Sequence, residues 1–311
     1  MAEKMATRQA YGSTLAALGA KDENIVVLDA DLSGSTMTKV FAKEFPERFF
    51  NVGIAEQNLY GIATGMALSG KTVFASTFAI FAAGRAFEII RNSIGYTRAN
   101  VKICATHAGV TVGEDGGSHQ AIEDMALMRT IPGMTVINPS DGVSAGKLIE
   151  KAAAMHGPVY VRLGRAAVPI VYDEETKFEI GKAVTLREGS DYTIIATGIM
   201  VNEALNAADV LEKQGLSIRV IDMHTIKPVD EETIAKAAKE TKGIVTAEEH
   251  TVIGGLGSCV AEVLAKKHPV PMEFIGIQDV FGQSGKPDEL MKAYNLTADD
   301  IVLAVERLKN R

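Results

Sequence analysis

The sequence NVGIAEQN spans residues Asn51 to Asn58 and lies where a predicted strand meets a predicted helix. FFNV at its start has the apolar character of a short strand, and LYGIATGMALSG behind it has the small and apolar residues of a buried helix. Ligands of α/β proteins bind at such junctions, beyond the carboxyl ends of strands. Glu56 is therefore a candidate functional carboxylate, although a glutamate at a helix start more often only complements the helix dipole.

Strand patterns alternate with helix patterns on both sides of this stretch, beginning with a helix over Thr7 to Leu18 that stops at Gly19. A second alternating set fills the last third of the chain. Between the two sets, the sequence does not continue this alternation of strand and helix patterns. This organisation predicts an α/β protein with two domains in series, each a mostly parallel sheet flanked by helices. We expect a first domain over residues 1–170, a linker over 171–189 and a second domain over 190–311.

The 311 residues are 47% hydrophobic and 23% charged, an ordinary composition for a soluble globular protein. A formal net charge of −7 without long basic runs argues against a nucleic-acid-binding surface. No segment approaches the ~20 apolar residues of a membrane span, and the N-terminus lacks the apolar core of a signal peptide. Cys104 and Cys259 form no CxxC pattern, so we expect a reduced protein in the cytoplasm.

Several candidate groups follow predicted strands of the first domain, whose carboxyl ends meet at one edge of a parallel sheet. In DADLSGS, Asp29 and Asp31 are expected to share a face, but a metal site is disfavoured because no third ligand is near. Glu56 is the second candidate. In STFAIF, Phe78 and Phe81 are three residues apart and can present to one side of a helix start. Such a pair is core packing more often than a ligand slot.

The strongest group is THAGVTVGEDGGSHQ, residues Thr106 to Gln120, which holds two histidines, two carboxylates and four glycines. Loops of this length without internal structure are usually functional or disordered. His107 and His119 bracket the acidic residues and suggest a polar site on flexible backbone. Metal-ligand spacings such as HExxH are absent, so recognition of hydroxyl or phosphate groups is favoured over metal binding.

Three arginines, Arg8, Arg162 and Arg165, bear the planar forks that suit phosphate and carboxylate groups. Arg165 follows the last predicted strand of the first domain and so lies near the same sheet edge. Each arginine taken alone is most simply a surface charge.

Taken together, these motifs resemble the thiamine diphosphate enzymes of the transketolase family. ADLSGS, FNVGIAEQN, STFAIF, THAGVTVGEDGGSHQ and the strand ending in Arg165 occur in the family's order and at family-like spacings. The chain looks like the C-terminal half of a transketolase, a pyrimidine-binding domain followed by the transketolase C-terminal domain. The resemblance implies a transferase of the pentose phosphate pathway, which moves a two-carbon ketol unit between ketose and aldose phosphates through a carbanion of the cofactor.

The resemblance also assigns residues to the cofactor. Glu56 would share a proton with N1′ of the aminopyrimidine ring, favouring the imino tautomer whose amine deprotonates the thiazolium carbon. That role requires a carboxyl group in a dry pocket. Phe78 and Phe81 would surround the pyrimidine, and Asp31 would support the cofactor edge of the site. Gly84 stands where many transketolases have a tyrosine, so one side of this pocket differs from the family pattern.

For the substrate, the resemblance implies charge-assisted hydrogen bonds to the sugar phosphate. The residues placed there are Arg8, Ser35, His107 and Arg165. Asp115 would contact a substrate hydroxyl, and His119 would contact the hydroxyls near the carbon that is transferred. The expected catalytic residues are therefore Glu56, His107 and His119. Arg162 matches no family role, so we expect it to be structural.

Magnesium and diphosphate are bound in this family through a GDG motif and a later asparagine, and no GDG occurs in this sequence. GEDGG at residues 113–117 is a different motif. The resemblance therefore implies a split enzyme, in which a partner chain with the GDG motif holds the diphosphate and Mg²⁺ or Ca²⁺. Active sites of this family lie between subunits, so we expect a heterotetramer of two copies of each chain, active only when complete.

Three alternatives remain. A 1-deoxyxylulose-5-phosphate synthase also carries a G-x-D-G-x-[TS]-H-Q loop, but it usually has arginine at the position of Phe81 and is usually one long chain. The β subunit of a 2-oxo-acid dehydrogenase also works with a partner, but it usually lacks the GEDGGSHQ loop. A non-catalytic scaffold subunit would keep the fold without the chemistry, and the presence of Glu56 and both histidines argues against it.

Overall fold

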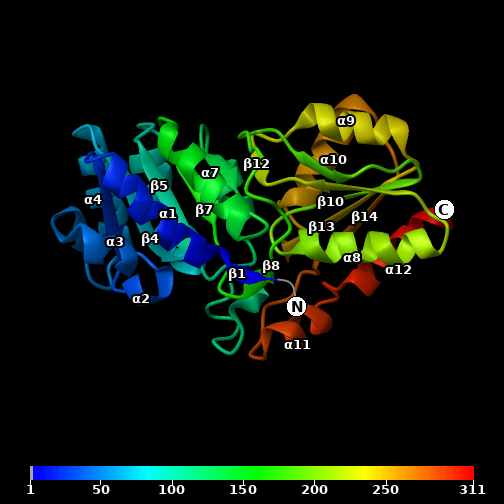
Figure 1. The fold of residues 1–311 in the computed structure, drawn as a ribbon, viewed down its shortest axis with the longest axis horizontal. Coiled ribbons are helices and arrows are strands. Elements are labelled where there is room, and N and C mark those ends of the chain that lie inside the picture. The colour runs from blue at the N-terminus through cyan, green and yellow to red at the C-terminus, as the bar shows by residue number, and fades with distance from the viewer. Residues whose placement is uncertain (1–2) are drawn as a thin grey trace.

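The computed structural model describes residues 3–311 and consists of two α/β units side by side (Figure 1). The N-terminal unit, blue to green in Figure 1, contains a seven-stranded sheet, and the C-terminal unit contains a five-stranded sheet. Helices cover both faces of each sheet. The predicted fold class, two mostly parallel sheets flanked by helices, is confirmed.

The first sheet has the strand order β12-β6-β7-β5-β4-β2-β3, and every neighbouring pair among its six N-terminal strands is parallel. These six strands are β2 (Ile25–Asp29), β3 (Phe49–Asn51), β4 (Thr72–Phe78), β5 (Val101–Thr106), β6 (Thr135–Ile137) and β7 (Val159–Arg162). The central strands β2 and β5 are buried at every residue, as expected of parallel strands covered on both faces. Their carboxyl ends therefore form one common edge.

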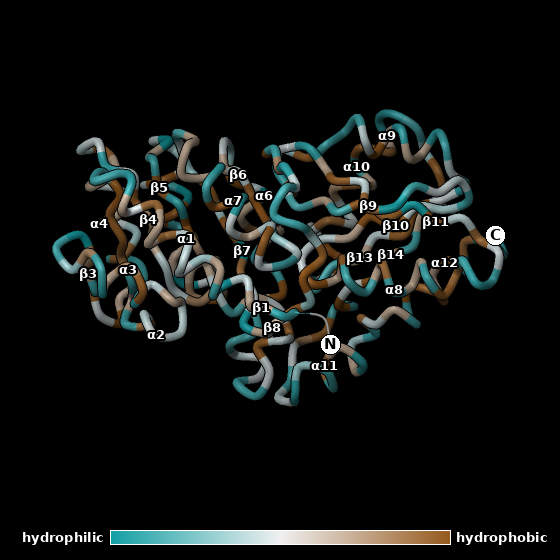
Figure 2. Tube along the Cα trace, viewed as in Figure 1, coloured by the Kyte–Doolittle hydropathy of each residue, from teal (hydrophilic) through white to brown (hydrophobic). Residues whose placement is uncertain are grey.

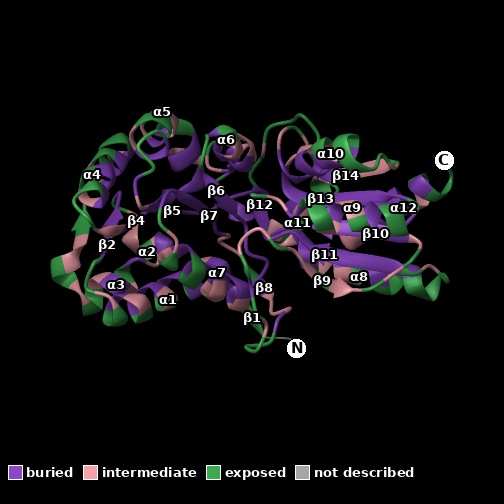
Figure 3. Ribbon diagram, turned by 90° about the horizontal axis from the view of Figure 1, so that it is seen from above, coloured by how far each residue is buried: buried purple, intermediate pink, exposed green. Residues whose placement is uncertain are grey.

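Two groups of helices enclose this sheet, and Figure 3 shows them on opposite sides of the buried strands. One side carries α4 (Glu56–Leu68), α5 (Phe87–Ile89) and α6 (Asp124–Thr130), and the other carries α1 (Thr7–Lys21), α3 (Lys39–Glu44) and α7 (Gly142–Ala154). Shorter elements are α2 (Ser33–Thr36), the 3₁₀ turns Pro46–Arg48 and Val110–Val112, and the π-helical turns Phe81–Arg85 and Ile90–Gly95.

Local chemistry explains where two of these helices begin and end. The Asp141 carboxylate accepts a hydrogen bond from the Ser144 amide at 2.7 Å and caps the start of α7. The prediction that the first helix stops at Gly19 is wrong, because α1 continues to Lys21. A Cβ on Gly19 would lie 2.4 Å from the Phe41 ring, so this glycine permits close packing of α1 on α3 rather than ending the helix.

The second sheet has the order β14-β13-β10-β11-β9. Its strands are β9 (Val184–Arg187), β10 (Tyr192–Ala196), β11 (Ile218–Asp222), β13 (Ile244–Thr251) and β14 (Met272–Ile277), and its helices are α8 (Met200–Lys213), α9 (Glu231–Glu240), α10 (Leu256–Lys267), α11 (Pro287–Ala293) and α12 (Ala298–Lys309). In Figure 1, α9 and α10 lie above the strands and α8 and α12 below them. Only β9 is antiparallel, and it lies within the segment 171–189 that we expected to be a linker.

Short strands tie the two units together. β12 (Thr225–Lys227) belongs to the C-terminal half of the chain but pairs with β6 and completes the first sheet. β1 (Lys4–Ala6) pairs with β8 (Ala167–Pro169), which joins the start of the first unit to its end. These strands have three residues each, too few to show a two-residue alternation in the sequence.

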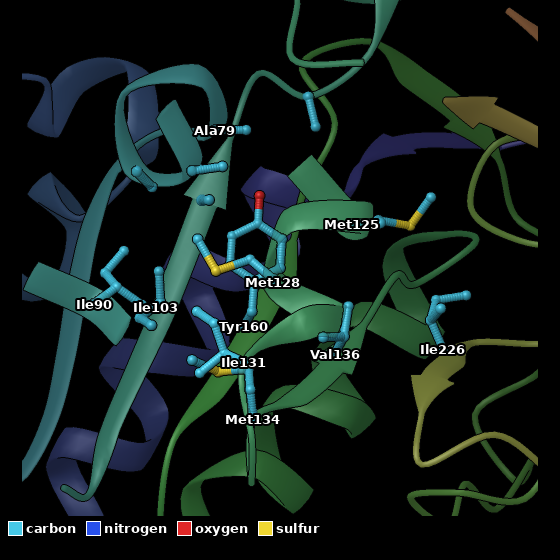
Figure 4. Packing of buried hydrophobic residues seen from close by; sticks show 14 of the residues in the cluster. Ala79, Ile90, Ile103, Met125, Met128, Ile131, Met134, Val136, Tyr160 and Ile226 are labelled. Atoms are coloured by element: carbon cyan, nitrogen blue, oxygen red, sulfur yellow. The ribbon is translucent and has the colours of Figure 1, made fainter. Parts of the chain in front are cut away.

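The hydrophobic core follows the strands and the inner helix faces, which are brown in Figure 2. One buried cluster continues from the first unit into the second. Figure 4 shows part of it, where Met125 and Met128 of α6 lie among Tyr160 of β7, Val136 of β6 and Ile226 of β12. Among residues 3–311, no helix has both the length and the apolar character that crossing a membrane requires.

Candidate active site

The candidate residues from five segments meet at the carboxyl edge of the first sheet. Asp31 and Ser35 follow β2, Glu56 follows β3, and Phe78 ends β4. The two-histidine loop follows β5, and Arg165 follows β7. Because these strands are parallel, the polar segments behind them emerge on the same side.

Glu56 is the first residue of α4, and its side chain is only 4% exposed. Its Oε1 accepts a hydrogen bond from Arg85 Nη1 at 2.8 Å, and the Arg85 side chain is 51% exposed. A glutamate that only complemented a helix dipole would remain in solvent. The burial of Glu56 beneath a half-exposed arginine therefore points to a role beyond the helix dipole.

Two stacked phenylalanines, Phe78 and Phe81, lie beside this carboxylate and form an aromatic wall. Phe78 stacks on His107 with ring centroids 3.9 Å apart, and on Phe81 with centroids 5.8 Å apart. His119 meets the Phe81 ring edge-on at 5.6 Å. The Arg85 guanidinium lies 4.5 Å from the centroid of Phe81 and so links the wall to Glu56. The structure thus brings together residues from the second, third and fourth sequence motifs.

His107 is buried and has the left-handed backbone conformation, with φ of 59°. Its Nδ1 is 2.9 Å from the Thr106 hydroxyl. Burial, and to a lesser extent the positive charges of Arg8 and Arg165, lower the pKa of His107 to about 3. His107 is therefore neutral at physiological pH and faces two cationic groups, which is the electrostatic setting of an anion site.

The two arginines are held by backbone carbonyls. Arg8 Nη1 donates to the Ser35 carbonyl at 2.7 Å, while its buried Nε has no partner among the described residues. Burial and the charge of Arg165 lower the pKa of Arg8. Arg165 Nη1 donates to the Val112 carbonyl and, at 3.1 Å, to Glu114. An unpaired guanidinium donor beside a second arginine suits a phosphate or a similar anion.

Asp31, Asp115 and His119 lie on the open side of this edge. Asn51 donates to the Asp31 carboxylate at 2.9 Å, which joins the first motif to the second. Asp115 is exposed, and His119 is half-buried with its Nδ1 3.0 Å from the Ser118 hydroxyl. All three side chains are accessible to a ligand at the edge.

The expectation that Asp29 shares a face with Asp31 is wrong. Asp29 is buried and accepts hydrogen bonds from the Leu32 amide and the hydroxyls of Thr36 and Thr38, at 2.6 to 2.9 Å. Burial raises its pKa. Asp29 therefore shapes the turn after β2, whereas Asp31 is exposed. Within residues 3–311, no three His, Cys, Asp or Glu side chains are grouped to hold a metal ion.

Arg162 has the structural environment that we expected. Its Nε donates to the Asp124 carboxylate at 2.9 Å, and its Nη2 donates to the Glu249 carbonyl in β13, also at 2.9 Å. Tyr160 donates to the same carboxylate at 2.7 Å. The pair is buried between the two units, away from solvent.

The sequence did not single out three side chains that organise the site: Arg85, Gln120 and Glu249. Gln120 Nε2 donates to the carbonyls of Val110 and of Gln283 in the C-terminal unit. The Thr111 amide donates to Glu249 Oε1 at 2.6 Å. Hydrogen bonds to the C-terminal unit therefore hold the two-histidine loop in place. Only Arg85 carried a local signal, since it follows Phe81 by about one helical turn.

Comparison with known proteins places this chain in a family. The family profile described as "Transketolase, pyrimidine binding domain" matches residues 3–171, and the profile "Transketolase, C-terminal domain" matches residues 181–301. The chain belongs to the transketolase family. The carboxylate, the aromatic wall and the arginine pair all lie within the part matched by the pyrimidine-binding profile.

Other transketolase chains share this length. A chain of Methanocaldococcus jannaschii named as a transketolase C-terminal section is 56% identical over 297 residues, 94% of this chain and 93% of its own. The 6-deoxy-6-sulfo-D-fructose transketolase subunit of Clostridium sp. (strain MSTE9) is 42% identical over 98% of this chain and 94% of its own. A solved structure described as a split gene transketolase, inactive β4 tetramer, has a TM-score of 0.91 and 54% identity over 98% of both chains.

Proposed function

We propose that this chain is the C-terminal subunit of a two-chain transketolase, which transfers a two-carbon ketol unit between ketose and aldose phosphates. The observation that carries the proposal is the buried Glu56 carboxylate beside the Phe78–Phe81 wall, next to an arginine pair at the same sheet edge. Residues 1–170 and 190–311 are its two domains, with 171–189 between them.

The wall and the carboxylate fit the aminopyrimidine of thiamine diphosphate. Thiamine diphosphate supplies, when bound, the carbanion chemistry of ketol transfer. Glu56 holds a proton at ring nitrogen N1′, and the phenyl rings of Phe78 and Phe81 orient the pyrimidine by stacking. Asp31, paired with Asn51, supports the cofactor edge. Gly84 leaves one side of the pocket without a side chain.

The diphosphate and its metal ion belong to a partner chain in this proposal. That partner carries the GDG motif and asparagine and holds Mg²⁺ or Ca²⁺. Two copies of each chain form the active heterotetramer. Support comes from the solved neighbour, whose description couples a split gene with an inactive tetramer of the β chain.

The sugar phosphate binds at the anion site, and the residues assigned to it are Arg8, Ser35, His107 and Arg165. A neutral His107 adds one N–H donor without another charge, because its pKa is about 3. Asp115 and His119 contact the substrate hydroxyls from the open side. His119 lies beside Phe81 and so contacts hydroxyls near the transferred carbon.

The anion could be a sulfonate as well as a phosphate, since arginine forks bind both kinds of oxyanion. The relative named for 6-deoxy-6-sulfo-D-fructose makes this a specific second candidate. Comparing fructose 6-phosphate with its 6-deoxy-6-sulfo analogue as ketol donors decides between the two substrates.

We place the enzyme in the cytoplasm. Cys104 and Cys259 are both buried free thiols, and burial raises the pKa of Cys104 to about 12. Unpaired cysteines suit a reducing compartment.

The test is ketol transfer by four samples: this chain, a GDG-containing partner, their mixture, and the mixture with Glu56→Gln. We expect turnover only in the unmodified mixture. Formation of 1-deoxyxylulose 5-phosphate from pyruvate would instead support the synthase alternative. Equal turnover with Glu56→Gln would reject the assigned role of Glu56, and turnover by this chain alone would reject the split enzyme.

A further inference from the structure

Arg85 makes two contacts in the candidate pyrimidine pocket at once. Its Nη1 donates to Glu56 Oε1 at 2.8 Å, and its guanidinium carbon lies 4.5 Å from the centroid of the Phe81 ring. Glu56 is buried and Arg85 is half-exposed, so the guanidinium covers the carboxylate from the solvent side. One planar group thus contacts two of the three side chains that the proposed function assigns to the pyrimidine, Glu56 and Phe81.

An aminopyrimidine offers the same chemistry as this guanidinium. Both are flat and can stack on a phenyl ring, and each can share a hydrogen bond with a carboxyl group, the guanidinium through an N–H and the pyrimidine through N1′. A pyrimidine stacked on Phe81 and hydrogen-bonded to Glu56 needs the space that the guanidinium fills. Resting on the proposed function, we infer that Arg85 occupies the pyrimidine's place in the free chain and must swing outward before the cofactor binds.

The backbone around Arg85 gives the side chain room for this movement. Arg85 ends the π-helical turn Phe81–Arg85, and such turns occur frequently at functional sites. Among the described residues, a Cβ on the preceding Gly84 would have one neighbouring atom within 4 Å, the Cδ1 of Ile80 at 3.9 Å. The space beside Gly84 is therefore open next to Arg85.

The two contacts are weak enough to be displaced. A half-exposed ion pair and an exposed cation–π contact each contribute little, because water screens the charges. A competing occupant lowers the apparent affinity in proportion to the fraction of chains it closes. The ion pair and the cation–π contact of Arg85 together should weaken pyrimidine binding roughly three- to thirtyfold relative to a chain without Arg85.

The direct test needs no partner chain and no catalysis. The cofactor's pyrimidine fragment, 4-amino-5-hydroxymethyl-2-methylpyrimidine, is titrated into the full-length chain and followed by NMR. We expect Arg85→Ala to bind it several-fold more tightly than the unmodified chain, and Arg85→Lys to fall between them because lysine keeps the charge but not the flat group. Arg91→Ala is the matched control, since the Arg91 side chain is exposed and, among residues 3–311, hydrogen-bonds only to Asn92.

Equal or weaker fragment binding by Arg85→Ala, including no binding by either chain, would overturn the inference. Adding Glu56→Gln to Arg85→Ala should abolish the gain, which separates an opened pocket from a nonspecific change. The proposed function is judged separately, by ketol transfer in the mixture of chains. If the mixture of chains is active but Arg85→Ala binds the pyrimidine fragment no more tightly, only the role of Arg85 is rejected.

Discussion

Two arginine–carboxylate pairs in this protein differ in their surroundings. In the Arg162–Asp124 pair, both side chains are enclosed, at 4% and 0% exposure, and Tyr160 and backbone carbonyls share the remaining hydrogen bonds. In the Arg85–Glu56 pair, the carboxylate is equally buried but the arginine is half-exposed. A pair that is closed on all sides joins structural units. A pair that is open on one side can exchange its arginine for a ligand.

Replacing Glu56 breaks the open pair and should have the largest effect. Glu56→Gln keeps the shape of the side chain but cannot hold a proton at N1′, so ketol transfer with the partner should fall by roughly 100- to 10,000-fold. Thermal unfolding should change little, because water reaches the half-exposed Arg85 and screens its ion pair with Glu56. Steady-state turnover and melting temperature are measured together. Glu88→Gln replaces an exposed glutamate of α5 and is the control that should retain activity.

Replacing Arg162 breaks the closed pair. Arg162→Ala leaves the Asp124 carboxylate buried without its cation, so the free energy of unfolding should drop by about 3–5 kcal/mol. Unfolding by denaturant measures this drop in the free energy of unfolding. Arg307→Ala removes an exposed arginine from Glu273 and should cost no more than about 1 kcal/mol. Similar losses in both variants would show that the enclosed pair is not special.

Replacing Arg165 tests whether the open edge binds an anion. Arg165→Ala should lower kcat/KM for a phosphorylated donor by roughly 10- to 100-fold, mainly by raising KM, because a charge-assisted hydrogen bond is lost. A donor without phosphate should be nearly unaffected. A fall in kcat alone, or an equal loss with both donors, would contradict the phosphate role.

The buried His107 predicts a dependence of stability on pH. Its folded pKa, about 3, lies below the ordinary value, so the neutral form stabilises the fold fully above pH 6.5, and this contribution is lost as the pH falls toward 3. At pH 5 the loss is about 2 kcal/mol. His107→Gln cannot be protonated and should lose less stability than the unmodified chain between pH 7 and pH 5. His156 is exposed, so His156→Gln should lose as much stability between pH 7 and pH 5 as the unmodified chain does.

The sequence was sufficient for the fold class because long apolar strands and amphipathic helices carry their own periodicity. It also predicted that Glu56, Phe78, His107 and Arg165 share one edge, since parallel strands end on the same side. It did not predict β12 in the first sheet, or the hydrogen bond from Thr111 to Glu249, because contacts between distant segments leave no periodic signal. Arg85 could be suspected from its distance to Phe81, but its contact with Glu56 depends on how α4 packs beside the π-helical turn.

The central claim is that this chain holds only the pyrimidine half of a cofactor site. Calorimetric titration of thiamine diphosphate with magnesium into this chain alone, and then into its mixture with a GDG-containing partner, tests that claim most directly. We predict strong binding only in the mixture. Tight binding by this chain alone would contradict the claim, because the chain would then hold the diphosphate with its own residues.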